Sequence, residues 1–291
     1  MAERKFNFLY TVPSSAIDGI CGMTPFSFMC LAQDLASYHY GTGGLSIPHL
    51  QKRGMTWVLI KQHFEIDEYP LWLDELTLST WAKTPSGLLC PRNFSYSYVP
   101  GGKKASIDAA LGISDRQIPQ RETPFARGVT TWMVLDMNTG KPVKPVPALF
   151  GTLPFCEEDA LPPVFPRFAF PVGVQDIKQM PFSPVITDID MNDHVNNLNY
   201  VRWILSFMPE HIYAARRISV LDTYFIASAK LGDNLVCKTA VLADNAGTEL
   251  AVNIPIECVH SIIRVTDGAE LFRARTIWKN TAEMCRELQV E

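Results

Sequence analysis

The sequence predicts an α+β fold in which one pattern, a long helix followed by antiparallel strands, occurs twice. Three observations support this prediction. The 291 residues are enough for about two domains. Hydrophobic residues make up 47% and charged residues 19%, which is typical of a chain that folds around a core. Ten of the 21 prolines fall between Pro142 and Pro184, and they separate two stretches that show the same order of elements.

Each half begins with a short strand in which aromatic residues alternate with other residues. Phe6 and Phe8 mark this strand in the first half, and Phe168 and Phe170 mark it 162 positions later. Alternation with a period of two is the pattern of a half-buried strand. We therefore expect an equivalent opening strand in each half.

A helix with one apolar face follows each opening strand. Thr24 and Pro25 suit the N-cap and first position of the first helix, and Asn196 or Asn197 suits the N-cap of the second. Pro209 ends the second helix. The apolar positions at helical spacing are Phe28, Leu31, Ala32 and Leu35, then Leu198, Val201, Leu205 and Met208.

After each helix the sequence shows strands only, and late strands in both halves carry a tryptophan, Trp132 and Trp278, near a turn sequence. One helix followed by four or five antiparallel strands predicts a curled sheet wrapped around that helix. We interpret the range 103–123 as a surface insertion. The domains expected are an N-terminal domain at 1–140, a proline-rich linker at 141–165 that cannot be a central strand, and a C-terminal domain at 166–291.

Composition excludes several classes of protein. Against 30 Asp and Glu there are 26 Lys and Arg, with no long basic run, so nucleic acid is not the expected partner. No apolar run reaches the ~18–20 residues of a membrane span. Seven cysteines without a C-x-x-C pair, and histidines without ligand spacing, argue against disulfides and zinc. We expect no metal and no cofactor. No transit segment is recognised before Lys5, so we expect a bacterial-type cytoplasmic protein.

The densest cluster of reactive polar side chains lies directly before the second helix. Asp190, Asn192 and His194 are two positions apart, so in an extended segment they line one wall. The following helix offers free N–H groups and the positive end of its dipole to a carbonyl oxygen that gains charge. This combination indicates acyl transfer or hydrolysis. The same residue types are also ordinary cap and turn residues, and the residues alone leave both interpretations open.

The segment from Asp188 to Tyr200 reads D-x-D-x-N-x-H-V-N-N-x-x-Y, with Trp203 and Pro209 after it. It resembles the motif of the acyl-(acyl carrier protein) thioesterases, which carry two hotdog domains in tandem. Further matches to the family's patterns are Trp57-Val58, Asp67-Glu68-Tyr69-Pro70, Trp72, Asp74, Thr80-Trp81, Gly268, Arg273, Arg275 and Trp278. The resemblance covers most of residues 5 to 280 outside the 103–123 insertion.

The resemblance implies hydrolysis of the thioester between a fatty acyl chain and acyl carrier protein, which releases free fatty acid and ends fatty acid synthesis. It implies that Asn192 polarises the carbonyl, that His194 acts on the water or the leaving thiolate, and that Asp190 holds these partners. It also implies that the N-terminal domain lines an acyl tunnel, although apolar side chains on such a helix face more often form plain core. The tunnel candidates are Phe26, Phe28, Met29, Leu31 and Trp57.

One departure from the plant-type members concerns a Glu, followed by Cys, in the strand after this helix. Ser228 stands near that position here. Either Asp222 or Asp193 replaces the missing carboxylate, or Asp190 with His194 suffices. The accessory candidates are Asp222, Ser228, Asn196 and Asn197.

An overlay of the halves at an offset of 169 places Cys21, Met23 and Pro25 opposite Asp190, Asn192 and His194. These three residues cannot do the same chemistry. We therefore expect a catalytically degenerate first half and one site per chain.

Several alternatives stay open from the sequence. They are an acyl-CoA thioesterase, a hotdog dehydratase or hydratase, and a non-enzymatic acyl-thioester-binding regulatory module, against which the intact trio argues. An acidic carrier protein calls for basic surface, and the short basic clusters are Lys52-Arg53, Lys103-Lys104 and Arg216-Arg217. Clusters of this kind more often form a solvated face than a docking site. Chain-length preference is open, as is the choice between a monomer (a pseudo-dimer) and a homodimer.

Overall fold

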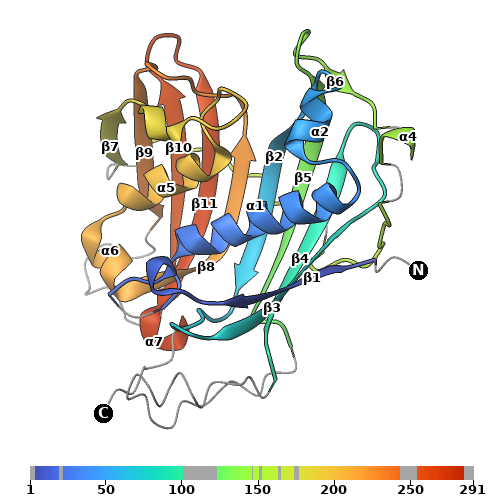
Figure 1. Ribbon diagram of the computed structural model, residues 1–291. Coiled ribbons are helices and arrows are strands. Elements are labelled where there is room, and N and C mark those ends of the chain that lie inside the picture. Colours follow the sequence, from blue (N-terminus) through green and yellow to red (C-terminus); the bar gives the residue numbers. More distant parts are fainter. Residues whose placement is uncertain are drawn as a thin grey trace.

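A computed structural model describes most of the chain, and Figure 1 shows its arrangement. The described residues are 4–19, 22–100, 123–145, 147–150, 153–162, 165–173, 177–242 and 254–284. The predicted insertion at 103–123 lies outside them except for Thr123. None of the helices in these ranges combines the length and the apolar character needed to cross a membrane.

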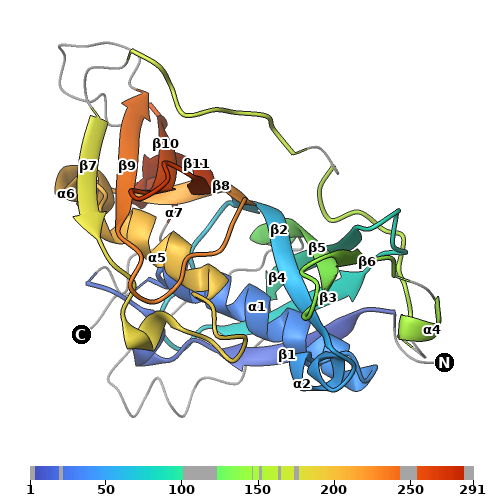
Figure 2. The ribbon, with the colours of Figure 1, turned by 90° about the horizontal axis from the view of Figure 1, so that it is seen from above.

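The strands form one antiparallel sheet that curves around two helices (Figures 1 and 2). They are β1 (Phe6–Thr11), β2 (Met55–Ile66), β3 (Glu75–Ala82), β4 (Cys90–Tyr98), β5 (Ala126–Asp136), β6 (Pro142–Val143), β7 (Ile177–Phe182), β8 (Arg216–Phe225), β9 (Leu235–Leu242), β10 (Ile256–Arg264) and β11 (Glu270–Asn280). Their order is β1-β3-β4-β5-β2-β8-β11-β10-β9-β7, and β6 pairs with β5. The two halves therefore repeat one strand order, and β2 and β8 join them at a central seam.

The helices α1 (Pro25–Thr42) and α5 (Asn197–Ser206) lie on the concave face of the sheet (Figure 1). Thr24 caps α1 by accepting the N–H of Ser27 at 3.0 Å, and Asn196 caps α5 by accepting the N–H of Leu198 at 2.9 Å. Both predicted caps are confirmed. The shorter helices are α2 (Ile47–Gln51), α4 (Pro147–Phe150), α6 (Glu210–Ala215) and α7 (Thr281–Met284), with 3₁₀ turns at η1 (Ser14–Ala16) and η2 (Ile186–Asp188).

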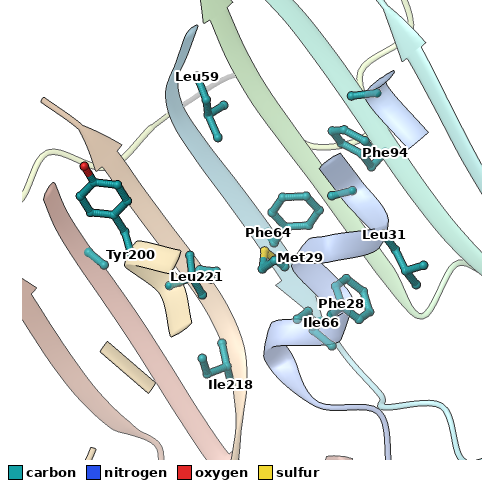
Figure 3. Close-up of a cluster of buried hydrophobic side chains, with 14 of the residues drawn as sticks. Phe28, Met29, Leu31, Leu59, Phe64, Ile66, Phe94, Tyr200, Ile218 and Leu221 are labelled. Carbon is teal, nitrogen blue, oxygen red and sulfur yellow. The ribbon is translucent and has the colours of Figure 1, made fainter. Parts of the chain in front are cut away.

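The core fills the space between these helices and the sheet. Figure 3 shows Met29 and Phe28 of α1 beside Phe64 of β2, with Leu221 of β8 across the seam. All four side chains are buried. Because apolar side chains of both halves meet without a break, the sheet and the two helices enclose one continuous core. The predicted α+β fold of two tandem hotdog units is confirmed.

The predicted opening strand of the second half is wrong. Phe168 and Phe170 lie in an irregular extended segment, and β7 begins at Ile177 instead. Pro166 and Pro171 flank the aromatic pair and lack the N–H that a strand ladder needs. The segment runs over the convex face of the sheet, where the Phe168 ring packs against Tyr224 at 5.5 Å (Figure 2).

The offset between the halves at the loops before α1 and α5 is 172 residues, so the predicted 169 is wrong by three. The N–H of Asp190 donates to the carbonyl of His194 at 2.8 Å, and that of Asp18 donates to the carbonyl of Gly22 at 3.2 Å. Asp190 thus corresponds to Asp18 and His194 to Gly22, while Asn192 corresponds to Ile20 in sequence. Backbone hydrogen bonds define this register, and they cannot be predicted from the residue types. The first half still lacks the Asn and the His.

Candidate active site

A tight loop between η2 and α5 carries the three polar residues singled out in the sequence. The N–H of Asp190 reaches the carbonyl of His194 at 2.8 Å, and the N–H of Asp193 reaches the carbonyl of Asp190 at 3.1 Å. Asp193 adopts a positive φ of 60°, a conformation that Asp tolerates better than most residues. The loop therefore turns sharply and presents its side chains beside the N-terminus of α5.

Asp188 fixes the base of this loop. Its side chain is 2% exposed, and its Oδ2 accepts the N–H of Val185 at 2.8 Å. Its Oδ1 pairs with Arg202, and its carbonyl accepts the Nδ2 group of Asn199 at 2.9 Å. Since Arg202 and Asn199 belong to α5, the loop and the helix form one unit. Asp188 thus acts on the site through the backbone.

Asn192 is held by residues of both halves. Its backbone N–H donates to Oδ1 of Asp190 at 2.8 Å. Its side-chain Oδ1 accepts Nε2 of Gln51 at 3.1 Å and Oγ1 of Thr56 at 2.9 Å, and Gln51 also reaches the carbonyl of Met191 at 3.3 Å. With the oxygen occupied by two donors, the amide orientation is set and Nδ2 is the group that can donate to a ligand.

Gln51 and Thr56 were missed by the sequence analysis. Gln51 ends α2 and Thr56 belongs to β2, so both come from the half without the trio. The only sequence signal is that Thr56 directly precedes Trp57 of the family pattern.

Asp190, Asn192 and His194 line a single pocket of about 520 Å³. The first half contributes Thr56 to Ile60 and the turn after β5, and the second half contributes the loop, Tyr200 and the segment after β8. His194 itself is exposed at this pocket. The structure therefore brings the predicted trio together at the junction of the two halves.

The accessory candidates other than Asp222, and the possible replacement carboxylate Asp193, lie in three different places. Ser228 and Asn197 line the same pocket as the trio. Asn196 caps α5 and lines an adjoining pocket of about 210 Å³. Asp193 lies at the tip of the turn and is exposed.

Asp222 lies away from the site, so its prediction as a replacement carboxylate is wrong. Its Oδ1 meets Nδ1 of His63 at 2.6 Å, and its Oδ2 accepts Nη1 of Arg275 at 3.1 Å. Side chains alternate across a strand, and the neighbouring Leu221 faces the concave core. Asp222 therefore faces the convex side, where it pairs with charges.

The tunnel candidates occupy different places. Trp57 lines both pockets, and Met29 lines a small inner cavity. Phe28 is fully buried against Tyr96 at 4.8 Å between ring centroids, and Leu31 is buried too. Phe26 lines a separate groove near α6. Only Trp57 and Met29 therefore adjoin the space a ligand could fill.

The described residues contain no group of three or more His, Cys, Asp or Glu side chains placed to hold a metal ion. The described cysteines are free thiols. Burial raises the pKa of Cys90 and of Cys237 to about 12, which disfavours a nucleophilic thiolate.

The basic pairs differ in their access to solvent. Arg216 and Arg217 are 5% and 1% exposed, and Arg217 pairs with Asp18 at 2.5 Å, so this basic pair is neither a solvated face nor a docking surface. Lys103-Lys104 lies outside the described residues. Lys52 and Arg53 are exposed directly after Gln51, beside the pocket.

Two protein-family models match different parts of the chain. The family model described as the acyl-ACP thioesterase N-terminal domain matches residues 3–109, and the one described as the C-terminal domain matches residues 173–280. The palmitoyl-acyl carrier protein thioesterase, chloroplastic, of Gossypium hirsutum is 24% identical over 267 residues, which cover 85% of this chain and 57% of that protein. The chain thus spans less than three fifths of this relative. The oleoyl-acyl carrier protein thioesterase, chloroplastic, of Coriandrum sativum is 23% identical, covering 87% and 71%.

Two solved structures share the fold along nearly the whole chain. An acyl-ACP thioesterase from Bacteroides thetaiotaomicron has a TM-score of 0.73 at 20% identity, covering 95% of this chain and 98% of that one. A 12:0-ACP thioesterase from Umbellularia californica has a TM-score of 0.76 at 18% identity, covering 96% and 99%. At these identities the likeness establishes the fold.

Proposed function

Because the chain belongs to the acyl-ACP thioesterase family, we propose that it hydrolyses fatty acyl thioesters of acyl carrier protein and releases free fatty acid, which ends fatty acid synthesis. The observation that supports the proposal most is the shared pocket of Asp190, Asn192 and His194. The pocket lies between the halves and continues toward the apolar core, as an acyl substrate requires.

The carbonyl of the thioester would sit against Nδ2 of Asn192 and the N-terminal end of α5. Both are donors aimed at an oxygen that becomes negative when water attacks. Asp190 holds the backbone of Asn192, while Gln51 and Thr56 hold its side-chain oxygen. Little reorganisation is then needed during the reaction.

His194 would move the protons. Its imidazole takes one proton from the attacking water as the oxygen–carbon bond forms, and it returns that proton to the thiolate as the carbon–sulfur bond breaks. The products are a fatty acid and the free thiol of the carrier arm. Ser228 adds a hydroxyl to the same wall where the plant-type pattern has a carboxylate.

The test measures hydrolysis of C8 to C18 acyl thioesters of acyl carrier protein and of CoA. A thiol-specific reagent detects the free thiol that hydrolysis releases. We expect hydrolysis of the carrier-protein substrates. His194→Ala should lower kcat by ~10²–10⁴, the usual worth of a positioned acid–base group. His211→Ala, which removes an exposed histidine on α6, is the matched control and should keep full activity.

Each rival function gives a different result in this assay. Preference for CoA substrates would indicate an acyl-CoA thioesterase. Turnover without thiol release would indicate a dehydratase or hydratase, and binding without turnover would indicate a regulatory module. Full activity of His194→Ala would reject the assigned site. The cytoplasmic location stays a prediction.

A further inference from the structure

Three residues with carboxamide side chains are among those that line a small cavity behind the active-site loop. Gln33 comes from α1, Gln62 from β2 and Asn197 from the first turn of α5. In the part of the chain that the structure describes, none of these carboxamides forms a hydrogen bond with another residue. The cavity measures about 10 Å³, room for one water-sized group. We call it the amide recess.

The sheet beneath the amide recess is polar as well. Gln62 pairs in register with Thr130 on one side and Thr223 on the other, so all three side chains share the concave face. Gln62 is only 6% exposed, and Oγ1 of Thr223 is buried without a partner in the described chain. Oγ1 of Thr130 accepts Nε1 of Trp132 at 2.8 Å, which leaves its own hydrogen to donate. Buried groups of this kind are normally paired, so an occupant is expected.

The amide recess adjoins the candidate site. It shares Asn197, Leu59 and Phe225 with the pocket that holds the trio, and it shares Gln33 and Trp132 with the adjoining pocket. These shared walls place the recess next to the pocket in which a chain with its thioester at Asn192 would lie.

The lining defines the chemistry of the occupant. Carboxamides both donate and accept, so they complement a group that does the same. Among the described residues that line the recess there is no Lys, Arg, Asp or Glu, which disfavours a carboxylate or an amine. The other walls, such as Met29 and Phe94, are apolar and suit a hydrocarbon chain.

Resting on the proposed function, we propose that the amide recess receives a hydroxyl group carried by the acyl chain, and that the preferred substrates are hydroxyacyl thioesters. A hydroxyl both donates and accepts, and it is the size of the cavity. Gln62 is the specificity-determining residue, because it is the most buried of the three carboxamides.

The test compares acyl thioesters of one length, either unsubstituted or with one hydroxyl at carbon 3, at mid-chain or at the terminal carbon. At one of these positions we expect kcat/KM about tenfold above the unsubstituted chain, the worth of one neutral hydrogen bond. Gln62→Leu should abolish this ratio while hydrolysis of the unsubstituted chain persists. An oxo chain, which accepts but cannot donate, should fall between the two.

Matched variants keep the comparison clear. Gln33→Leu removes a second carboxamide at a less buried position and should reduce the ratio if Gln62→Leu does not fold. Gln179→Leu makes the same change on an exposed position of β7 and should leave the ratio unchanged. Two results would overturn the proposal and leave water as the occupant. In the first, the wild type hydrolyses unsubstituted chains as fast as every hydroxylated chain. In the second, Gln62→Leu leaves the ratio intact.

Calorimetric titration with free hydroxy fatty acids separates this proposal from the function on which it rests. If no thioester is hydrolysed but the hydroxy acid binds about tenfold more tightly than the plain acid, and Gln62→Leu removes that difference, the proposed function fails and the recess stands. If thioesters are hydrolysed but neither assay shows a hydroxyl preference, the recess fails and the function stands.

Discussion

Asn192 depends on side chains from both halves of the molecule, although it belongs to the second. Its Oδ1 accepts from Gln51 and Thr56, which lie 141 and 136 positions earlier. A catalytic amide must present its N–H group in one orientation, and these two donors set that orientation. The half that lacks the Asn and the His therefore still orients a side chain of the candidate site.

Replacing Thr56 by Val removes one of these donors and keeps the shape of the side chain. We expect kcat to fall about tenfold with little change in KM, because the lost hydrogen bond acts on carbonyl polarisation rather than on chain binding. Steady-state kinetics on the best acyl thioester measure this split.

Two variants make the Thr56 result specific. Thr56→Ser keeps the hydroxyl and should restore most of kcat. Thr77→Val on β3 makes the same change far from the loop and should have no effect on kcat. A fall in kcat together with a rise in KM, not rescued by Ser, would mean that Thr56 is merely structural.

Met29 tests the acyl channel at the scale of one side chain. It lines the amide recess and comes from α1. Met29→Ala enlarges the space and should shift released fatty acids toward longer chains, whereas Met29→Phe should shift them toward shorter ones. Fatty-acid profiling by gas chromatography measures the shift. Leu31→Ala, in the nearby core, is the control, and an equal shift there would contradict a channel at Met29.

At the scale of the elements, strand β5 must approach the core closely at Gly128. A Cβ built at this position would lie 2.2 Å from Cε1 and 2.4 Å from Cδ1 of the Phe64 ring. The ring is fully buried, so it has little room to move. The absence of a side chain at Gly128 leaves room for the ring of Phe64, its partner in the neighbouring strand β2.

Gly128→Ala should lower the free energy of unfolding by ~1–3 kcal/mol, the usual cost of overpacking a core. Chemical denaturation monitored by tryptophan fluorescence measures the change. Gly41→Ala in α1, where a Cβ meets nothing within 4 Å, should be neutral or stabilising. Equal stability of wild type and Gly128→Ala would show that the ring can move aside.

Local signals predicted some elements correctly and failed for others. Thr24-Pro25 and Asn196 cap the helices as expected, because capping depends on residues within one turn. The prediction of a strand at Phe168 was wrong because it rested on an alternation like that at Phe6. The actual edge strand, β7, contains Pro181, which hides it from a strand pattern. An edge strand accepts a proline where its N–H would face outward, and this cannot be seen without the sheet order.

The grouping of the candidate site residues was predictable only where they are close in sequence. Asp190, Asn192 and His194 share one loop, and the structure places them on one pocket. The contacts of Gln51 with Asn192, and of Asp222 with His63, join segments more than 130 residues apart in the sequence. Such contacts follow from the sheet register, which residue types do not encode.

At the scale of the whole molecule, the seam between β2 and β8 carries an ionic cluster on its convex face. Nδ1 of His63 meets Oδ1 of Asp222 at 2.6 Å, and its Nε2 lies 3.5 Å from Glu65. Burial alone would lower the pKa of His63, but the Asp222 hydrogen bond and both carboxylates outweigh it and raise the pKa. The contact between His63 of β2 and Asp222 of β8 therefore links the two halves, and it is strengthened when the ring is protonated.

This raised pKa makes the seam sensitive to pH. The contribution to stability is complete below the unfolded pKa of about 6.5 and is lost as pH rises through the folded value above it. We expect the Tm of the wild type to fall more between pH 6 and pH 8 than that of His63→Gln. His49→Gln is the control, since that histidine lies on α2 away from the seam. Parallel Tm profiles of the wild type and His63→Gln would contradict the assignment.

The same seam has a consequence during synthesis. β8 begins at Arg216, roughly 150 residues after β2 ends, so at about 5–20 residues per second the ribosome needs roughly 8–30 s to supply the partner strand. Throughout this interval β2 is an open edge, the kind of surface at which neighbouring nascent chains pair wrongly. The charges at Lys61, His63 and Glu65 lie along that edge, and charged side chains are a common protection against such pairing.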